Sequence, residues 1–129
     1  MYAWVVENTD AGRNFVAKIW KNGSGTSLTT GKAVARSVFV SGTDVYVAGY
    51  EYNGTHQVAT VWKNGVTIPL SNGTSDMFAN SVFVYGTDVY VAGREEVGPV
   101  YFAKIWKNGV LTTSANQLPL FGSYFHICK

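Results

Sequence analysis

The sequence contains one stretch of fifteen residues twice, with only two changes. "SVFVSGTDVYVAGYE" runs from Ser37 to Glu51, and "SVFVYGTDVYVAGRE" runs from Ser81 to Glu95. A second motif, Ala-x-[Ile/Val]-Trp-Lys-Asn-Gly, occurs three times, with its tryptophan at positions 20, 62 and 106. The 129 residues therefore divide into three units, over residues 1–43, 44–87 and 88–129. Internal repeats of this kind determine the fold class, and the length is that of one domain.

Each unit divides into short strands at its turn signals. Ser-Gly-Thr-Asp predicts one tight hairpin, and Lys-Asn-Gly predicts another, because Asn and Gly both tolerate positive φ. The first three strands are apolar on both faces, which is typical of a sheet packed between two others. No stretch has a helical period, so we expect an all-β chain. In the middle of the chain the expected strands are Ala35–Val40, Asp44–Glu51, His56–Trp62 and Val66–Leu70.

A period of about 40 to 50 residues made of four strands is typical of propeller blades. The tandem S-V-F-V-x-G-T-D-V-Y-V-A-G and W-K-N-G motifs resemble the blade repeats of bacterial β-propeller proteins, over nearly the whole chain. The resemblance implies a fold and not one function, because propellers include lectins, enzymes and scaffolds. A β-trefoil, which also has three units of four strands, is the alternative fold.

The repeat starts partway through a unit. Residues 1–7 align with residues 45–51, which places Glu7 opposite Glu51 and Glu95. Three blades are fewer than the four that propellers usually need, whereas two chains make six. We therefore expect a homodimeric six-bladed ring, in which Met1–Glu7 of one chain pairs with Tyr124–Cys128 of the other. The alternative is that the chain is a fragment of a longer propeller.

Composition excludes several classes of partner. The formal net charge is +2 with scattered basic residues, which is too weak for a nucleic-acid interface. Apolar runs are shorter than a membrane helix needs, and the first ten residues do not read as a signal peptide. Cys128 is the only cysteine, so no internal disulfide forms. We expect a cytoplasmic protein without nucleic-acid or membrane partners and without a cofactor.

The loops that differ between units predict where a ligand binds. The Gly-Thr-Asp and Lys-Asn-Gly turns recur almost unchanged, because hairpin geometry constrains them. The loops over residues 8–14, 52–55 and 96–101, and the stretches between units, differ throughout. Variable loops on a constant scaffold are free to carry recognition. We therefore expect binding on the face of the molecule that carries these variable loops.

The candidate ligand-binding residues lie beside the variable loops. Glutamates at the end of the second strand suit cations or sugar hydroxyls, or accept hydrogen bonds from their own loops. Arg36, Asn80 and Arg94 indicate either an anion site or a structural Arg–Glu bridge. Divergent aromatic residues are either platforms for sugars or loop anchors. The predicted set is Glu7, Glu51, Glu95, Arg36, Asn80, Arg94, Tyr50, Tyr52, Phe78 and Tyr101.

The repeated tryptophans Trp20, Trp62 and Trp106 lie beside a constant hairpin, so we expect them to pack between units. No metal-ligand spacing or catalytic motif occurs, and catalytic residues are therefore not assigned. We predict a non-enzymatic, lectin-like module that binds a glycan or a small polar ligand on its variable loops. A protein-interaction scaffold is the alternative. A propeller hydrolase or lyase that uses Glu51, Glu95 and Arg36 ranks third.

Overall fold

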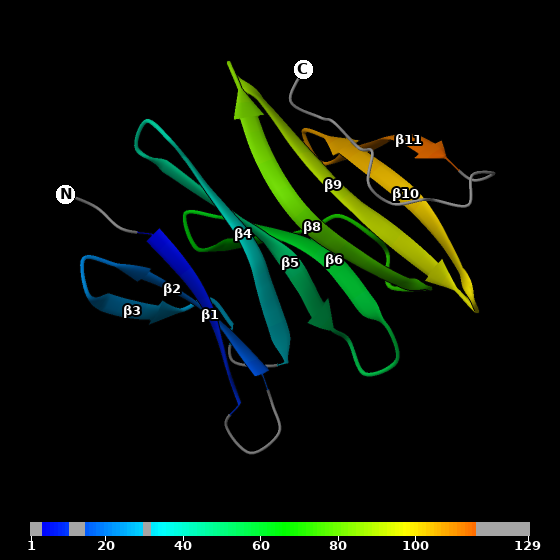
Figure 1. Cartoon of the computed structure of the whole chain (residues 1–129), viewed down its shortest axis with the longest axis horizontal. Coiled ribbons are helices and arrows are strands. Elements are labelled where there is room, and N and C mark those ends of the chain that lie inside the picture. The colour runs from blue at the N-terminus through cyan, green and yellow to red at the C-terminus, as the bar shows by residue number, and fades with distance from the viewer. Residues whose placement is uncertain (1–3, 11–14, 30–31, 116–129) are drawn as a thin grey trace.

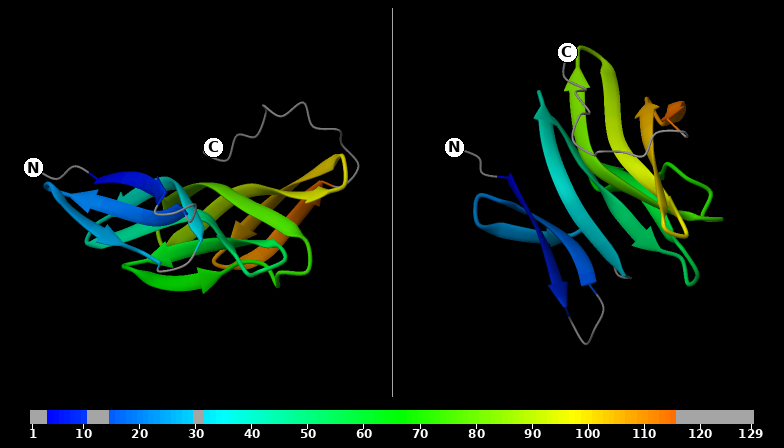
Figure 2. Two further views of the ribbon diagram at one scale, coloured as in Figure 1. Left: turned by 90° about the horizontal axis from the view of Figure 1, so that it is seen from below. Right: turned by 45° about the vertical axis from the view of Figure 1, so that its right-hand side comes forward.

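The computed structural model describes residues 4–10, 15–29 and 32–115. These residues form strands and no helix, so the prediction of an all-β chain is confirmed. The strands make three antiparallel sheets, which follow one another from left to right in Figure 1. Two further views show the same succession (Figure 2). The described ranges contain no helix that could span a membrane.

Each sheet is a meander in which consecutive strands pair. The first sheet contains β1 (Trp4–Asp10), β2 (Phe15–Lys21) and β3 (Ser24–Ser27). The middle sheet contains β4 (Ala33–Ser41), β5 (Asp44–Tyr52), β6 (Gln57–Lys63) and β7 (Val66–Pro69). The last sheet contains β8 (Asp76–Tyr85), β9 (Asp88–Val97), β10 (Val100–Lys107) and β11 (Val110–Ala115). The four strands predicted in the middle of the chain are confirmed, with each end shifted by at most two residues.

In the middle and last sheets, the repeated Asn-Gly turn connects the two constant hairpins. Asn64 and Asn108 each have a φ of 52° and precede a glycine with a φ of 85°, as a type I′ turn requires. Asn64 Oδ1 accepts a hydrogen bond from the Val45 backbone N–H at 2.9 Å, and Asn64 Nδ2 donates to Asp44 Oδ1 at 3.0 Å. Asn108 makes the same two bonds in the last sheet. These bonds explain why the Thr-Asp-Val and Lys-Asn-Gly turns recur together.

The two faces of each sheet carry different side chains, and we name the faces by them. The tryptophan face carries the repeated tryptophan. The aliphatic face carries the alanine and the isoleucine or valine that lie three residues and one residue before it. The tryptophan face of the middle sheet packs on the aliphatic face of the first sheet, and that of the last sheet packs on the middle sheet. The middle sheet is therefore covered on both faces, which accounts for its two-sided apolar pattern.

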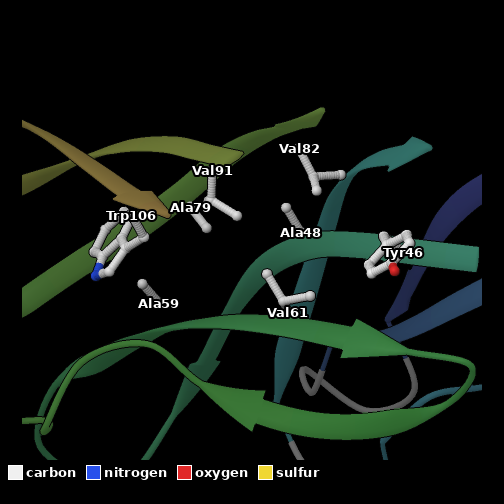
Figure 3. Close-up of a cluster of buried hydrophobic side chains, with 8 residues drawn as sticks. All are labelled: Tyr46, Ala48, Ala59, Val61, Ala79, Val82, Val91 and Trp106. Atoms are coloured by element: carbon white, nitrogen blue, oxygen red, sulfur yellow. The ribbon is translucent and has the colours of Figure 1, made fainter. Parts of the chain in front are cut away.

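The tryptophans are central to these interfaces. Trp106 is 1% exposed, and its indole Nε1 donates a hydrogen bond to the Leu70 carbonyl oxygen of the neighbouring sheet at 3.1 Å. Trp62 is equally buried against the first sheet. The prediction that these two tryptophans pack between units is confirmed. Trp20 is half-buried. Figure 3 shows the interface of the middle and last sheets, formed by Tyr46, Ala48, Ala59, Val61, Ala79, Val82, Val91 and Trp106.

A β-bulge interrupts the first strand of the middle and last sheets at equivalent positions. The register of β4 against β5 shifts at Arg36, and that of β8 against β9 shifts at Asn80. A glycine lies opposite each bulge. A Cβ atom on Gly49 would lie 1.9 Å from the Val34 carbonyl oxygen, and one on Gly93 would lie equally close to the equivalent carbonyl. Only glycine allows two backbones to approach this closely.

The expected equivalence of Glu7 with Glu51 and Glu95 is wrong. Glu7 pairs with Lys18, two residues before the repeated tryptophan, whereas Glu51 and Glu95 pair with the residue four before it. Glu7 therefore occupies the position at which the other two sheets have glycine. The pairing of β1 with β2, counted from the tryptophan in β2, determines this register. An alignment that matched one glutamate with another did not include that constraint.

Candidate functional site

Five of the predicted residues form one stack of side chains where β5 and β9 end. Arg36 is the bulge residue of β4, and Phe78 lies near the start of β8. Tyr50 and Arg94 lie near the ends of β5 and β9, and Tyr101 lies near the start of β10. The middle and last sheets both contribute to this arginine–aromatic stack. The loops beside the stack are among those that differ between units.

The members of the arginine–aromatic stack contact one another in series. The Arg36 guanidinium carbon lies 5.9 Å from the centroid of the Tyr50 ring, which meets the Phe78 ring edge to face at 4.7 Å. The Arg94 guanidinium carbon lies 4.3 Å from the Phe78 centroid and 5.4 Å from the Tyr101 centroid. A guanidinium over an aromatic ring is attracted by the ring quadrupole. The stack therefore connects the two sheets at their variable ends.

Arg94 is also held by polar partners. Its Nε donates to Glu96 Oε2 at 2.9 Å, and its Nη1 lies 3.5 Å from Asn80 Oδ1. The structural Arg–Glu bridge considered for Arg94 is therefore present. Glu96 was not among the predicted residues, although residues two apart on a strand share a face and this spacing could have indicated the pair. Arg94 is thus a positioned member of the stack whose charge is already balanced.

Arg36 and Tyr101 are the members of the stack that are open to solvent. Arg36 is exposed, and no carboxylate among the residues whose side chains are described forms an ion pair with it. Tyr101 is 49% exposed although its ring contacts Arg94. An exposed aromatic ring suits the apolar face of a sugar, and an arginine binds a carboxylate through two parallel hydrogen bonds. The stack therefore combines both kinds of contact.

Glu95 lies on the opposite face of β9 and is engaged in the protein interior. Its carboxylate accepts a hydrogen bond from Ser75 Oγ at 2.6 Å and lies 3.2 Å from Lys104 Nζ. The Glu95 and Lys104 side chains are 18% and 9% exposed. The Ser75 hydrogen bond, assisted by the Lys104 ammonium, lowers the pKa of Glu95. Glu95 is therefore a structural ion-pair residue.

Glu51 lies at the equivalent position of the middle sheet but has a different environment. The middle sheet has Thr60 in place of Lys104, and the Thr60 hydroxyl donates to the Val58 carbonyl oxygen. Desolvation by burial raises the pKa of Glu51. The pKa values of the two glutamates, predicted as a matched set, therefore shift in opposite directions, because Glu95 has the Ser75 hydroxyl and the Lys104 ammonium as partners.

Tyr52 and Glu7 lie apart from the stack. The Tyr52 hydroxyl donates to the Gly54 carbonyl oxygen at 2.9 Å, and Lys32 Nζ lies 5.5 Å from the Tyr52 ring centroid. These contacts fit the interpretation of Tyr52 as a loop anchor. The backbone of Glu7 belongs to β1, and its side chain lies outside the described part of the structure. Cys128 as a whole lies outside the described part of the structure.

Replacing Glu95 by glutamine is expected to lower the free energy of unfolding at pH 7 by about 2 kcal/mol, because Lys104 loses its buried carboxylate partner. The pKa of Glu95 is lower in the folded chain, so its stabilisation is complete above pH 4.5 and is lost as pH falls below that value. The effect of Glu95→Gln should therefore shrink at pH 3, as urea unfolding at both pH values will measure.

The matched control is Glu51→Gln. The pKa of Glu51 is raised in the folded chain, so ionisation of Glu51 weakens folding as pH rises above 4.5. Glu51→Gln is therefore expected to stabilise the protein slightly at pH 7. An equal loss of stability in Glu95→Gln at pH 7 and pH 3 would contradict the assigned ion pair.

The described residues include no group of three metal-ligating side chains suited to a metal ion. Catalysis by Glu51, Glu95 and Arg36 gains no support from the geometry, because Glu95 is paired with Lys104. Comparisons with protein-family models, with curated proteins and with solved structures find no match for this chain.

Proposed function

We propose that this chain is a non-enzymatic binding module of propeller-type blades that recognises a glycan at the arginine–aromatic stack. The observation that carries the proposal is the exposed pair of Arg36 and Tyr101 at the two ends of the stack. A propeller architecture is supported by three successive antiparallel meanders, each packed face to face on the next. In a β-trefoil the units would share one barrel rather than form separate sheets.

The chemistry of the stack favours a glycan that carries a carboxylate. Arg36 offers a guanidinium without a carboxylate partner among the described side chains, and Tyr101 offers a half-exposed ring. An oligosaccharide that contains uronic acid offers a carboxylate to the first and the apolar ring face of another sugar unit to the second. Individual sugar contacts are weak, so a second copy of the site would add avidity.

Binding is tested with an array of neutral and uronate-containing oligosaccharides, followed by calorimetry on those retained. Tyr101→Ala is expected to weaken binding about tenfold, which corresponds to about 1.4 kcal/mol. Arg36→Gln is expected to remove the preference for the uronate over the neutral oligosaccharide. Tyr85→Ala is the control, because Tyr85 is 72% exposed and lies at the other end of β8. Binding that is unaffected by Tyr101→Ala, or no binding at all, would reject the proposal.

A protein-interaction scaffold is the second candidate. Val97 and Val100 pair with each other beside the β9–β10 hairpin and are both about half exposed, so they form a small apolar surface. Such a surface suits a protein partner when it extends over several hundred Å². Retention of a protein partner that is lost in Val97→Ser, without any glycan binding, would favour the scaffold.

A further inference from the structure

The internal repeat shows twice what covers an aliphatic face. The aliphatic face of the first sheet is covered by Val47 and Trp62 of the middle sheet, together with two alanines of β4. The aliphatic face of the middle sheet is covered by the equivalent Val91 and Trp106 of the last sheet, together with Ala79 and Val82 of β8. Both interfaces therefore use the same contact, in which a tryptophan face packs on an aliphatic face. This packing is seen within one chain, so it does not depend on the proposed function.

The last sheet repeats the residues that receive such a contact. Tyr90, Ala92 and Ile105 occupy the positions of Tyr46, Ala48 and Val61. The three residues of the middle sheet are buried, whereas their counterparts on the last sheet are only half-buried. This difference indicates that the aliphatic face of the last sheet has the composition of an interface but a lesser degree of cover. Covering apolar side chains of this kind with a matching face lowers the free energy of the system.

The first sheet repeats the part of this contact that a tryptophan and its partner valine provide, and its described residues include no counterpart of β4 or β8. Trp20 pairs with Val5 across β1 and β2, as Trp62 pairs with Val47 and Trp106 with Val91. Trp20 is half-buried, while the other two tryptophans are 1% exposed. Of the three tryptophan faces in the described ranges, that of the first sheet is the one that no other sheet covers in the manner of Figure 3.

We propose that the aliphatic face of the last sheet is the docking surface for the tryptophan face of the first sheet of a second copy of this chain. With twofold symmetry, each copy covers the last sheet of the other, and six sheets close into a ring. This assigns the dimer interface to a packing of sheet faces. The exchange of terminal strands expected from the sequence, Met1–Glu7 with Tyr124–Cys128, involves residues outside the described ranges.

Light scattering coupled to size exclusion gives the first test. The unmodified chain is expected to have twice its mass of 14.0 kDa at micromolar concentration. Ile105→Glu, which places a charge in the docking surface, is expected to reduce the mass to 14.0 kDa. Val66→Glu is the control, because Val66 is 64% exposed on the edge strand of the middle sheet and should leave the dimer intact. Far-ultraviolet circular dichroism checks that both variants are folded.

Mixing two variants tests which faces meet. Trp20→Lys and Ile105→Glu are each expected to be monomeric alone, since either one damages both copies of the contact. Together they form one unmodified contact and one in which lysine faces glutamate, so the mixture should recover dimer. Should Ile105→Glu not fold, Ala92→Glu probes the same face. A mass of 14.0 kDa for the unmodified chain at all concentrations, or a dimer that survives these substitutions, would overturn the proposal.

Discussion

Replacing Gly93 by alanine is expected to lower the free energy of unfolding by about 4 kcal/mol or more. The added Cβ would lie 1.9 Å from the Phe78 carbonyl oxygen, far inside any van der Waals contact. The conflicting atom is backbone, so no side-chain rotation relieves the overlap, and the bulge at Asn80 has to open. Effects of this size are exceptional for one methyl group, and here the cause is the contact between two backbones. Urea denaturation followed by circular dichroism measures the change.

Gly86→Ala is the matched control. A Cβ at Gly86 has no neighbour within 4 Å, but the residue has a φ of +65°. Its replacement is therefore expected to cost only the left-handed backbone strain, about 1 to 2 kcal/mol. Gly49→Ala should behave as Gly93→Ala does, because it meets the equivalent carbonyl oxygen at the same distance. Equal losses for Gly86 and Gly93 would contradict the close approach of the backbones.

Trp106→Ala is expected to lower the free energy of unfolding by about 4 kcal/mol. The side chain is 1% exposed between the middle and last sheets, so its removal leaves a large cavity. The same variant leaves the Leu70 carbonyl oxygen without its indole donor. Because Trp106 is the largest buried side chain of this interface, we expect the last sheet to lose protection from amide hydrogen exchange first.

The phenylalanine variants separate packing from hydrogen bonding. Trp62 is as buried as Trp106, but no group in the described structure accepts a hydrogen bond from its Nε1. Trp106→Phe is therefore expected to cost about 1 kcal/mol more than Trp62→Phe, which is the contribution of one hydrogen bond. Equal costs in the two variants would mean that the bond to Leu70 adds nothing to stability.

The bulges link the stability of the fold to the candidate site. Arg36 and Asn80 are the bulge residues, and both side chains lie at or beside the arginine–aromatic stack. Gly49 and Gly93 permit the bulges because they lack a Cβ. Partly destabilised glycine variants should therefore lose ligand binding as well as stability. The site depends on a backbone feature that its own side chains do not create.

The sequence by itself determined the strands, the turns and the layering of this protein. Strand limits follow from apolar runs that end at turn residues, and Asn-Gly has few other low-energy conformations. Two-sided apolar strands required sheets covered on both faces, as the middle sheet is. The sequence also identified the variable loops, near which Arg36, Tyr50 and Arg94 meet.

Only the tertiary structure decided the register of β1 and the partners of the charged residues. Glu7 lies opposite Lys18 because β1 pairs with β2 from Asp10 opposite Phe15 to Trp4 opposite Lys21. Glu95 forms an ion pair because the neighbouring strand carries Lys104, whereas Glu51 has Thr60 there and forms no ion pair with a described side chain. Such contacts depend on which strands and sheets meet in space. The periodicity of residues along the chain carries no information about which strands and sheets those are.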